Sequence, residues 1–273
     1  MAQVKVEDTA YILSAGRSRC EWLSRDPFAK YLVPESAQKL FDEYVLNSHP
    51  SETWAGSLRQ RYFLESIEKF FVEFPQGRLI NIGAGFSTYP YILSGDRPYL
   101  EFDSSNTIAH KKKVLEDLKS KGLLPEREVQ YVVCNLDDDL ETVTKTIQEW
   151  GSGIPFYVLL EGVVCYLKPQ TLTKLFTEFS LLQSKGSLIG LEYWDEKQKT
   201  HPVFLSFIGF LADHFDVSMD YQYQNKEFFE TLQGYRIVDH RDQKQIAKDY
   251  GLQKKLDGIE TMGDETHVLL EKL

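Results

Sequence analysis

The sequence predicts an α/β fold with a doubly wound, mostly parallel sheet of seven strands, and three observations support this. From Leu79 onward, short apolar runs alternate with segments whose apolar residues recur at helical spacing. The first apolar run is followed at once by Gly83-Ala84-Gly85, and the second ends at Asp103, 20 residues after Gly83. Because strand–helix alternation places helices on both faces of a sheet, most neighbouring strands are expected to run parallel.

The segment before the sheet has a helical pattern and lacks the alternation typical of strands. Asp26-Pro27 interrupts this pattern, because the residue before a proline disfavours helical geometry. We therefore expect a helical N-terminal lobe over residues 1–75 and a sheet domain over residues 76–273. Helices in the lobe are expected at Asp8–Leu23, Pro34–Leu46 and Ser57–Phe71.

The sheet domain is expected to contain seven strands, the last two of which follow an irregular insertion at 194–224 that would act as a lid. The strands are expected at Leu79–Ile82, Tyr99–Phe102, Val129–Leu136, Phe156–Leu160, Ser187–Tyr193, Tyr235–Asp239 and His267–Leu270. Helices are expected at Thr107–Lys121, Leu140–Trp150 and Gln170–Ser184, and from Asn225 to Gly234.

The composition excludes several classes of function. The 41 acidic residues outnumber the 31 basic ones, and the net charge of −10 argues against a nucleic-acid partner, which needs a basic field. A run of lysines from Lys111 to Lys113 is expected to be a solvated helix face. No apolar run reaches the length of a membrane span, and the N-terminus lacks an apolar signal core. We therefore expect a cytoplasmic protein without a membrane partner, and no Cys/His spacing suggests a metal.

The glycine turn after the first strand favours an adenosine-containing cofactor. Glycine lets the backbone approach a nucleoside closely, and an acid such as Asp103 can accept hydrogen bonds from a ribose diol. A dinucleotide site would have a third glycine where this chain has Thr88, which disfavours a nicotinamide enzyme. A cofactor without phosphates, of which S-adenosylmethionine is the common example, fits better. A tight turn without a ligand is the alternative.

Several segments together resemble the leucine carboxyl methyltransferase family, within the class I methyltransferases, whose Rossmann-like sheet has seven strands. Two departures from its pattern are Ser87-Thr88-Tyr89, where the family often has Asp-Thr-Arg, and Asn135-Leu136, where it usually has Asp-Leu. The matching segments are Arg25-Asp26-Pro27-Phe28, Arg59-Gln60-Arg61-Tyr62-Phe63, Asn81-Ile82-Gly83-Ala84-Gly85, Glu101-Phe102-Asp103, Glu161-Gly162-Val163-Val164-Cys165-Tyr166-Leu167 and Gly234-Tyr235.

The resemblance implies roles for individual residues around S-adenosylmethionine. Arg61, or its neighbour Arg59, would bind the methionine carboxylate, and Arg17 is a further candidate; a solvent-facing arginine is the alternative for each. Glu161, with Gly162, would face the methionine portion. The remaining expected contacts are the glycine turn with Gly83, Ala84 and Gly85, Asp103 at the ribose, and Asn135 with Leu136 beside the adenine.

The implied function is S-adenosylmethionine-dependent O-methylation of a carboxylate or hydroxyl on a small molecule, with the carboxylate favoured by the resemblance. A hydroxyl acceptor usually needs a general base, whereas a carboxylate does not. The candidates for such a base are Glu192, Tyr193, His201 and His214, and a lone histidine in such a stretch is more often packed or exposed than catalytic. The alternatives are a methyltransferase for the C-terminal leucine of a type 2A phosphatase, and a cofactor-binding protein without transfer activity.

Overall fold

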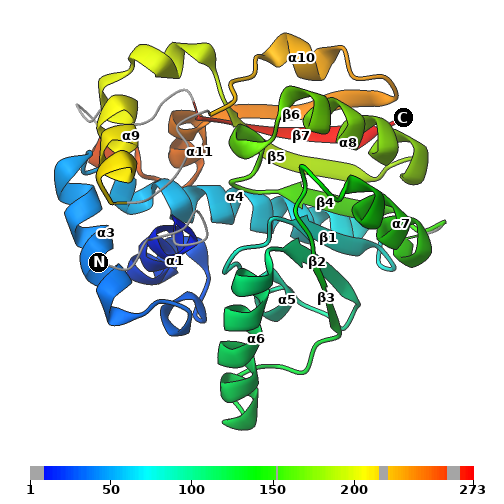
Figure 1. Cartoon of the computed structure of the whole chain (residues 1–273), viewed down its shortest axis with the longest axis horizontal. Helices are drawn as coiled ribbons and strands as arrows, with labels where there is room; N and C mark the ends of the chain where they lie inside the picture. Colours follow the sequence, from blue (N-terminus) through cyan, green and yellow to red (C-terminus); the bar gives the residue numbers. More distant parts are fainter. Residues whose placement is uncertain (1–8, 152, 215–220, 257–264) are drawn as a thin grey trace.

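The computed structural model describes residues 9–151, 153–214, 221–256 and 265–273. Within these residues, seven strands form one mixed sheet in the order β3-β2-β1-β4-β5-β7-β6 (Figure 1). The strands are β1 (Arg78–Ile82), β2 (Tyr99–Asp103), β3 (Val129–Val133), β4 (Phe156–Leu160), β5 (Leu188–Trp194), β6 (Tyr235–Asp242) and β7 (Glu265–Lys272).

The strand directions confirm the predicted fold class. Strands β1 to β5 pair in parallel, and β7 inserts antiparallel between β5 and β6. The order reverses at β1, whose neighbours are β2 and β4. Ligands of doubly wound sheets bind beyond the carboxyl ends of the strands at such a switch point. A ligand site is therefore expected at the residues that follow β1, β2 and β4.

Helices cover both faces of the sheet, and each face has its own apolar core. On one face, α7 (Leu140–Gly151), α8 (Pro169–Leu182) and α10 (Lys226–Glu230) pack against side chains such as Ile80 and Val158. On the other face, α4 (Glu52–Glu73) and α11 (Gln243–Asp249) pack against their strand neighbours Leu79 and Tyr157. Because successive side chains of a strand point to opposite faces of the sheet, neighbouring residues belong to different cores. Helix α4 thus begins in the helical part of the chain but forms a layer of the sheet domain.

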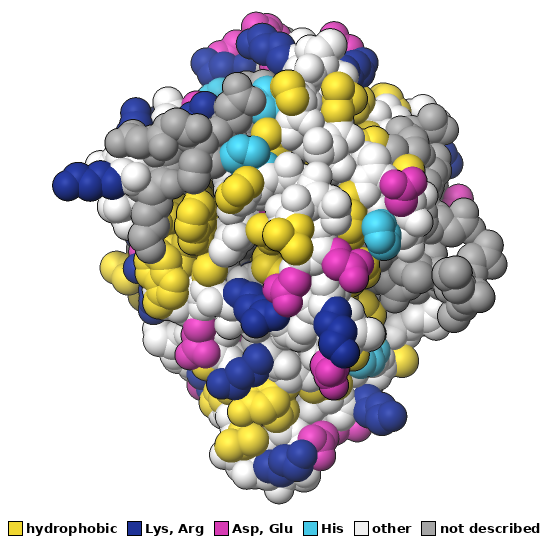
Figure 2. Space-filling model, turned by 90° about the vertical axis from the view of Figure 1, so that its left-hand side faces the viewer, with side chains coloured by type: hydrophobic (Ala, Val, Ile, Leu, Met, Phe, Trp, Pro, Cys, Tyr) yellow, Lys and Arg dark blue, Asp and Glu magenta, His cyan; other side chains and the backbone are white. Residues whose placement is uncertain are grey.

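Among the remaining N-terminal elements, α2 (Glu21–Ser24) packs against α4, whereas α1 (Thr9–Arg19) and α3 (Glu35–Asn47) pack against the segment between β5 and β6, on the left of Figure 1. Their shared core includes Ile12, Phe41, Phe204 and Phe210. On the outer face of this side, basic and acidic side chains are interspersed (Figure 2). The other elements on this side are η2 (Ala29–Tyr31), η4 (Glu196–Thr200) and α9 (Pro202–His214).

Several boundaries differ from the sequence prediction. The first expected helix is two helices, α1 and α2, and the expected irregular insertion at 194–224 contains η4 and α9. Strand β3 ends at Val133, three residues before the predicted end. The further elements are α5 (Tyr89–Ile92), α6 (Ser105–Ser120), η3 (Val164–Tyr166) and α12 (Gln253–Leu256).

The lysine run is only partly the solvated face that was expected. Lys112 and Lys113 are exposed, but Lys111 is buried and donates a hydrogen bond of 2.6 Å to Glu101 Oε2. Glu101 lies on β2 and is buried as well, so the pair joins α6 to the sheet. Among the described helices, none combines the length and apolar character needed to cross a bilayer.

Candidate functional site

The glycine turn after β1 is tied to the end of β2. Gly83 has φ +66° and Gly85 has φ +49°, a region in which side chains other than glycine are strained. A Cβ atom on Gly83 would lie 2.3 Å from Val163 Cγ2, so the turn has no room for a side chain there. Asp103 Oδ2 accepts a hydrogen bond of 2.6 Å from the Gly85 N–H. Asp103, which the spacing predicts to lie near the glycine turn, therefore contacts the turn directly.

A cavity of about 470 Å³, here named the turn cavity, lies between this turn and helix α1. Helix α1 contributes one wall, and the loops after β1 and β4 contribute the others. Arg59 reaches the cavity from α4. The lining residues are Thr9, Ala10, Leu13, Arg17, Arg59, Asn81, Gly83, Ala84, Gly85, Phe86, Ser87, Glu161 and Gly162.

Arg59 is buried and lies among three carboxylates. Its Nε atom is 3.2 Å from Glu161 Oε1, and its Nη1 atom is 3.1 Å from Glu265 Oε1 and 3.7 Å from Glu192 Oε1. Glu161 also accepts a hydrogen bond of 2.6 Å from the Tyr89 hydroxyl. A guanidinium offers five donors in a planar fork, which suits it to this position. The arrangement fixes both Arg59 and Glu161 at the edge of the turn cavity.

A second cavity of about 800 Å³, here named the apolar cavity, adjoins the first. Thr9, Leu13, Arg59 and Gly162 line both cavities, so the two meet at these residues. Its other walls are mainly aromatic and aliphatic and come from α1, α3, α4, α9, η3 and β5. They include Ile12, Phe41, Tyr44, Ala55, Cys165, Tyr166, Trp194, Phe207 and Leu211, with Glu52, Glu192 and Glu265 as acidic members.

Two of these glutamates are buried with one oxygen unpartnered among the described residues. Glu52 Oε2 accepts a hydrogen bond from the Tyr44 hydroxyl, and Glu192 Oε1 accepts one from the Gly162 N–H. Glu52 Oε1 and Glu192 Oε2 have no hydrogen-bond partner in the described part of the chain. Desolvation by burial raises the pKa of Glu52 to about 7 and that of Glu192 to about 8.

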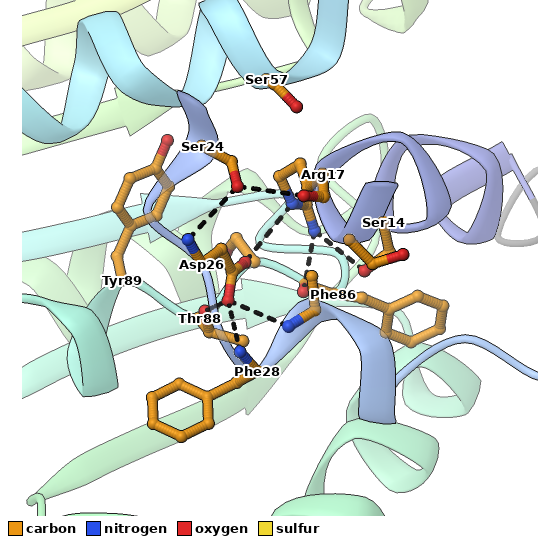
Figure 3. Close-up of polar contacts among 12 residues, drawn as sticks. Ser14, Arg17, Ser24, Asp26, Phe28, Ser57, Phe86, Thr88 and Tyr89 are labelled. Atoms are coloured by element: carbon orange, nitrogen blue, oxygen red, sulfur yellow. Dashed lines mark hydrogen bonds and ion pairs between the residues drawn. The ribbon is translucent and has the colours of Figure 1, made fainter. Parts of the chain in front are cut away.

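A buried network joins the N-terminal helices to the loop after the glycine turn (Figure 3). Arg17 donates hydrogen bonds of 3.1 Å to Ser14 Oγ and 3.0 Å to the Phe86 carbonyl. Its Nε atom is 3.5 Å from Asp26 Oδ2. Asp26 Oδ1 in turn accepts a hydrogen bond of 2.6 Å from the Thr88 hydroxyl. The network therefore holds α1 over the turn cavity.

Most of the residues predicted to bind a cofactor come together. Arg17, Arg59, Gly83, Ala84, Gly85, Glu161 and Gly162 line the turn cavity, and Asp103 contacts it through Gly85. Arg61, the preferred arginine, does not line it. Its side chain is partly exposed and pairs with Glu65 at 2.6 Å. Residues two apart on a helix do not share a face, so Arg59 and Arg61 point in different directions.

The two residues expected beside an adenine do not line the turn cavity either. Asn135 is exposed and donates a hydrogen bond of 2.6 Å to Asp138 Oδ2. Leu136 is partly buried against the apolar core of the sheet. Both follow β3, which lies at the edge of the sheet beyond β2.

The four candidates for a base occupy different surroundings. Glu192 lines the apolar cavity. Tyr193 faces the opposite side of the sheet, as expected for the next residue in a strand, and its hydroxyl lies 3.0 Å from His240 Nε2. His214 stacks on Phe210, and neither His201 nor His214 lines either cavity.

Glu52 and Glu265 were not predicted as site residues. Glu52 opens α4, and Glu265 opens β7 directly opposite Trp194 in the ladder with β5. Neither lies in a recognisable sequence pattern. The glutamates meet only because α4 and β7 pack against the same end of β5.

Comparison with known proteins gives a consistent family. The sequence profile of the leucine carboxyl methyltransferase family matches residues 13–180, which is more than half of the chain. A curated protein of Mycobacterium sp. (strain KMS), provisionally named an S-adenosyl-L-methionine-dependent methyltransferase, is 26% identical over 201 residues. The match covers 68% of this chain and 65% of that relative, so it spans slightly less than two thirds of the relative's length.

Solved structures share the fold at low sequence identity. A crystal structure of a provisionally assigned methyltransferase from Thermobifida fusca has a TM-score of 0.68 at 10% identity and covers 100% of this chain and 96% of its own. A DUF574 family protein from Streptomyces avermitilis has a TM-score of 0.63 at 11% identity, and the match covers 97% of each chain. At these identities, the likeness concerns the fold alone.

Proposed function

Because the chain belongs to the leucine carboxyl methyltransferase family, we propose that it is an S-adenosylmethionine-dependent O-methyltransferase acting on a small molecule. The observation that carries this proposal is the meeting of two cavities at Arg59 and Gly162. One cavity lies at the glycine turn, where a nucleoside cofactor fits, and the other is apolar and suited to an acceptor. Methyl transfer requires donor and acceptor to be held in line and away from water.

The residues of the turn cavity fit S-adenosylmethionine. Gly83 and Gly85 line the cavity without side chains, which suits the close approach of a nucleoside to the backbone. Asp103 retains lone pairs on both oxygens for a ribose diol, although each oxygen already accepts one backbone hydrogen bond. Arg17 supplies buried positive charge for the methionine carboxylate, and Arg59, which pairs with three acids, holds Glu161 beside the methionine portion. When bound, this cofactor supplies an electrophilic methyl group on its sulfonium.

The apolar cavity supports a small-molecule acceptor. Its lining is mostly aromatic and aliphatic with a few polar side chains, which is typical of small-molecule sites. Trp194 and Phe207 contribute aromatic walls, and Gly162 and Arg59 stand where the acceptor would meet the methyl group. The names of the curated mycobacterial relatives agree with S-adenosylmethionine as the expected cofactor.

Two measurements test this function. Calorimetry should detect S-adenosylhomocysteine binding to the purified protein. A coupled assay for S-adenosylhomocysteine formation should then detect turnover with members of a panel of small hydroxyl and carboxyl compounds. Binding without turnover on any acceptor would indicate a non-catalytic cofactor-binding protein. Turnover only with a peptide ending in the phosphatase C-terminal leucine would indicate the protein-directed alternative.

A further inference from the structure

The apolar cavity carries an unusual charge balance for a site that would bind an anion. Among its described lining residues, three are acidic, namely Glu52, Glu192 and Glu265, and one is basic, namely Arg59. Arg59 lies within 3.7 Å of carboxylate oxygens from Glu192 and Glu265, and it also contacts Glu161 outside the cavity. Its positive charge is therefore already shared among three acids.

The unpartnered atoms in this cavity are carboxyl oxygens, which are hydrogen-bond acceptors when the two glutamates are ionised. Glu52 and Glu192 are each 4% exposed, and each has one carboxylate oxygen without a hydrogen-bond partner among the described residues. A buried polar atom of this kind costs stability unless a ligand satisfies it. A carboxylate acceptor has no proton to donate and would add negative charge beside these oxygens. A hydroxyl acceptor would donate the missing hydrogen bond.

Resting on the function proposed above, we propose that the methyl acceptor is an uncharged, largely apolar molecule with a hydroxyl group, and that Glu192 is its general base. Glu192 is chosen over Glu52 because it contacts Gly162, which lines both cavities. The hydroxyl proton passes to Glu192, the oxygen forms the new bond to the methyl carbon, and the electrons of the broken sulfur–carbon bond stay on S-adenosylhomocysteine. The products are the methyl ether and a protonated glutamate.

An amine acceptor is less compatible with the same cavity. A primary amine is an ammonium ion at neutral pH, and neighbouring carboxylates favour that charged form. An ammonium has no lone pair for attack on the methyl group. The acidic cavity would thus bind an amine in its unreactive state, whereas a hydroxyl stays neutral until its proton is removed.

Glu192 is a base in its ionised form, so transfer should increase as the pH rises through the pKa of this residue. Burial raises its pKa to about 8, Arg59 from α4 opposes this change, and Glu265 and Glu161 add to it. A catalytic base is most effective when its pKa is near the working pH. The other titratable groups that face it are Cys165 in η3, and His267, its cross-strand neighbour on β7.

The first test compares matched probes that differ only in the reacting group. With the protein saturated by S-adenosylhomocysteine, calorimetry at a pH above 8, where both glutamates are mostly ionised, should show 1-naphthol binding about tenfold more tightly than 1-naphthoate, a difference of about 1.4 kcal/mol in binding free energy. The aromatic lining of Trp194 and Phe207 suits both ring systems equally. Equal or tighter binding of 1-naphthoate would overturn the proposal.

The second test uses Glu192→Gln, which keeps an oxygen to accept the Gly162 N–H but is not a base. Transfer to the best hydroxyl compound of a mixed hydroxyl, carboxyl and amine panel should fall by about 10²–10⁴-fold. Affinity for S-adenosylhomocysteine and cooperative thermal unfolding should persist, which separates loss of the base from loss of folding. Glu196→Gln, at an exposed position of η4, is the matched control and should retain full turnover.

The outcomes separate a failure of the proposed hydroxyl acceptor from a failure of the proposed methyltransferase function. If the wild-type protein does not bind S-adenosylhomocysteine, the proposed function fails. If it binds the cofactor product but methylates only carboxylic acids or amines, the proposed hydroxyl acceptor is wrong while cofactor-dependent transfer stands. Unchanged hydroxyl turnover in Glu192→Gln would remove Glu192 as the base.

Discussion

Arg59 Nε lies 3.2 Å from Glu161 Oε1, although the two residues are 102 positions apart in the sequence. Arg59 comes from α4 and Glu161 directly follows β4, so the contact joins a helix of the N-terminal half to the carboxyl edge of the sheet. Both side chains line the turn cavity. The candidate site therefore depends on the docking of α4 against the sheet.

Replacing Arg59 by Lys should weaken cofactor binding and destabilise the fold. Lysine keeps one positive charge but lacks the planar fork that serves Glu161 and Glu265 from separate nitrogens. Loss of one partner of a buried ion pair typically lowers the free energy of unfolding by about 3–5 kcal/mol. Because lysine keeps the positive charge, the loss for Arg59→Lys should be at or below this range. Calorimetry with S-adenosylhomocysteine and chemical denaturation measure the two effects.

Arg61→Lys is the matched control on the same helix. Arg61 is partly exposed and pairs with Glu65 one turn along α4, a type of contact worth about 0.3–0.5 kcal/mol. The control should bind S-adenosylhomocysteine like the wild type. If Arg61→Lys lost affinity and Arg59→Lys did not, the assignment of the arginine in the site would have to be reversed.

Replacing Asp103 by Asn should reduce cofactor affinity, with some loss of stability. Asparagine keeps one oxygen to accept the Gly85 N–H, but its amide nitrogen cannot accept from the Ser104 N–H, and the charge that a ribose diol would use is lost. Hydrogen bonds to charged groups contribute about 1.5–3 kcal/mol, which corresponds to roughly 10- to 150-fold in affinity. Asp96→Asn, in the exposed loop before β2, is the control. Unchanged affinity for S-adenosylhomocysteine in Asp103→Asn would rule out ribose binding by this residue.

The features predicted correctly from the sequence are those with a local signal. The apolar runs of the strands, the glycine turn and the position of Asp103 all follow from residue spacing within about 25 residues. Parallel strands then bring their carboxyl ends together, so a residue at the end of one strand predicts part of the site. Glu161 directly follows β4, and the structure has it in the turn cavity together with the glycine turn that follows β1.

The features that were missed depend on which surfaces pack together. Arg59 and Arg61 lie in the same short segment, and only the docking of α4 decides which of them is buried. Lys111 looks like its exposed neighbours in the sequence, yet it pairs with Glu101 on a strand. Glu52 and Glu265 are single acids without a pattern, and three-dimensional packing alone brings them to one cavity.

Replacing Gly85 by Val should abolish cofactor binding. Gly85 lines the turn cavity at φ +49°, and a branched side chain there would be strained and would project toward a bound nucleoside. Gly122→Val is the matched control, because Gly122 also has a positive φ of +67° but has nothing within 4 Å of an added Cβ atom. Both variants should lose some stability to backbone strain, and only Gly85→Val should lose S-adenosylhomocysteine binding. Normal titration of Gly85→Val would mean that the turn has a purely structural role.

The buried acid Glu52 should make the fold less stable as the pH rises from about 4.5 to about 7. Burial raises the pKa of Glu52 from the usual 4.5 to about 7, and the nearby charge of Glu265 adds to this increase. A hydrogen bond from Tyr44 and the positive charge of Arg59 act in the opposite direction. A carboxyl whose folded-state pKa is raised binds its proton more tightly in the folded state. The stabilising effect of that proton is complete below the unfolded pKa and is lost as the pH rises through the folded pKa.

Glu52→Gln isolates this effect, because glutamine resembles the protonated acid at every pH. Near pH 5 the variant and the wild type should have similar free energies of unfolding, and by pH 8 the variant should be more stable by about 3 kcal/mol. Buried His267, whose pKa is lowered to about 3 by desolvation, changes stability in the opposite sense below neutrality but is common to both proteins. Urea denaturation at pH 5, 7 and 8 measures the difference, with the exposed Glu35→Gln as control. A wild-type-to-variant difference that stays constant over this range would show that Glu52 is ionised in the folded protein throughout.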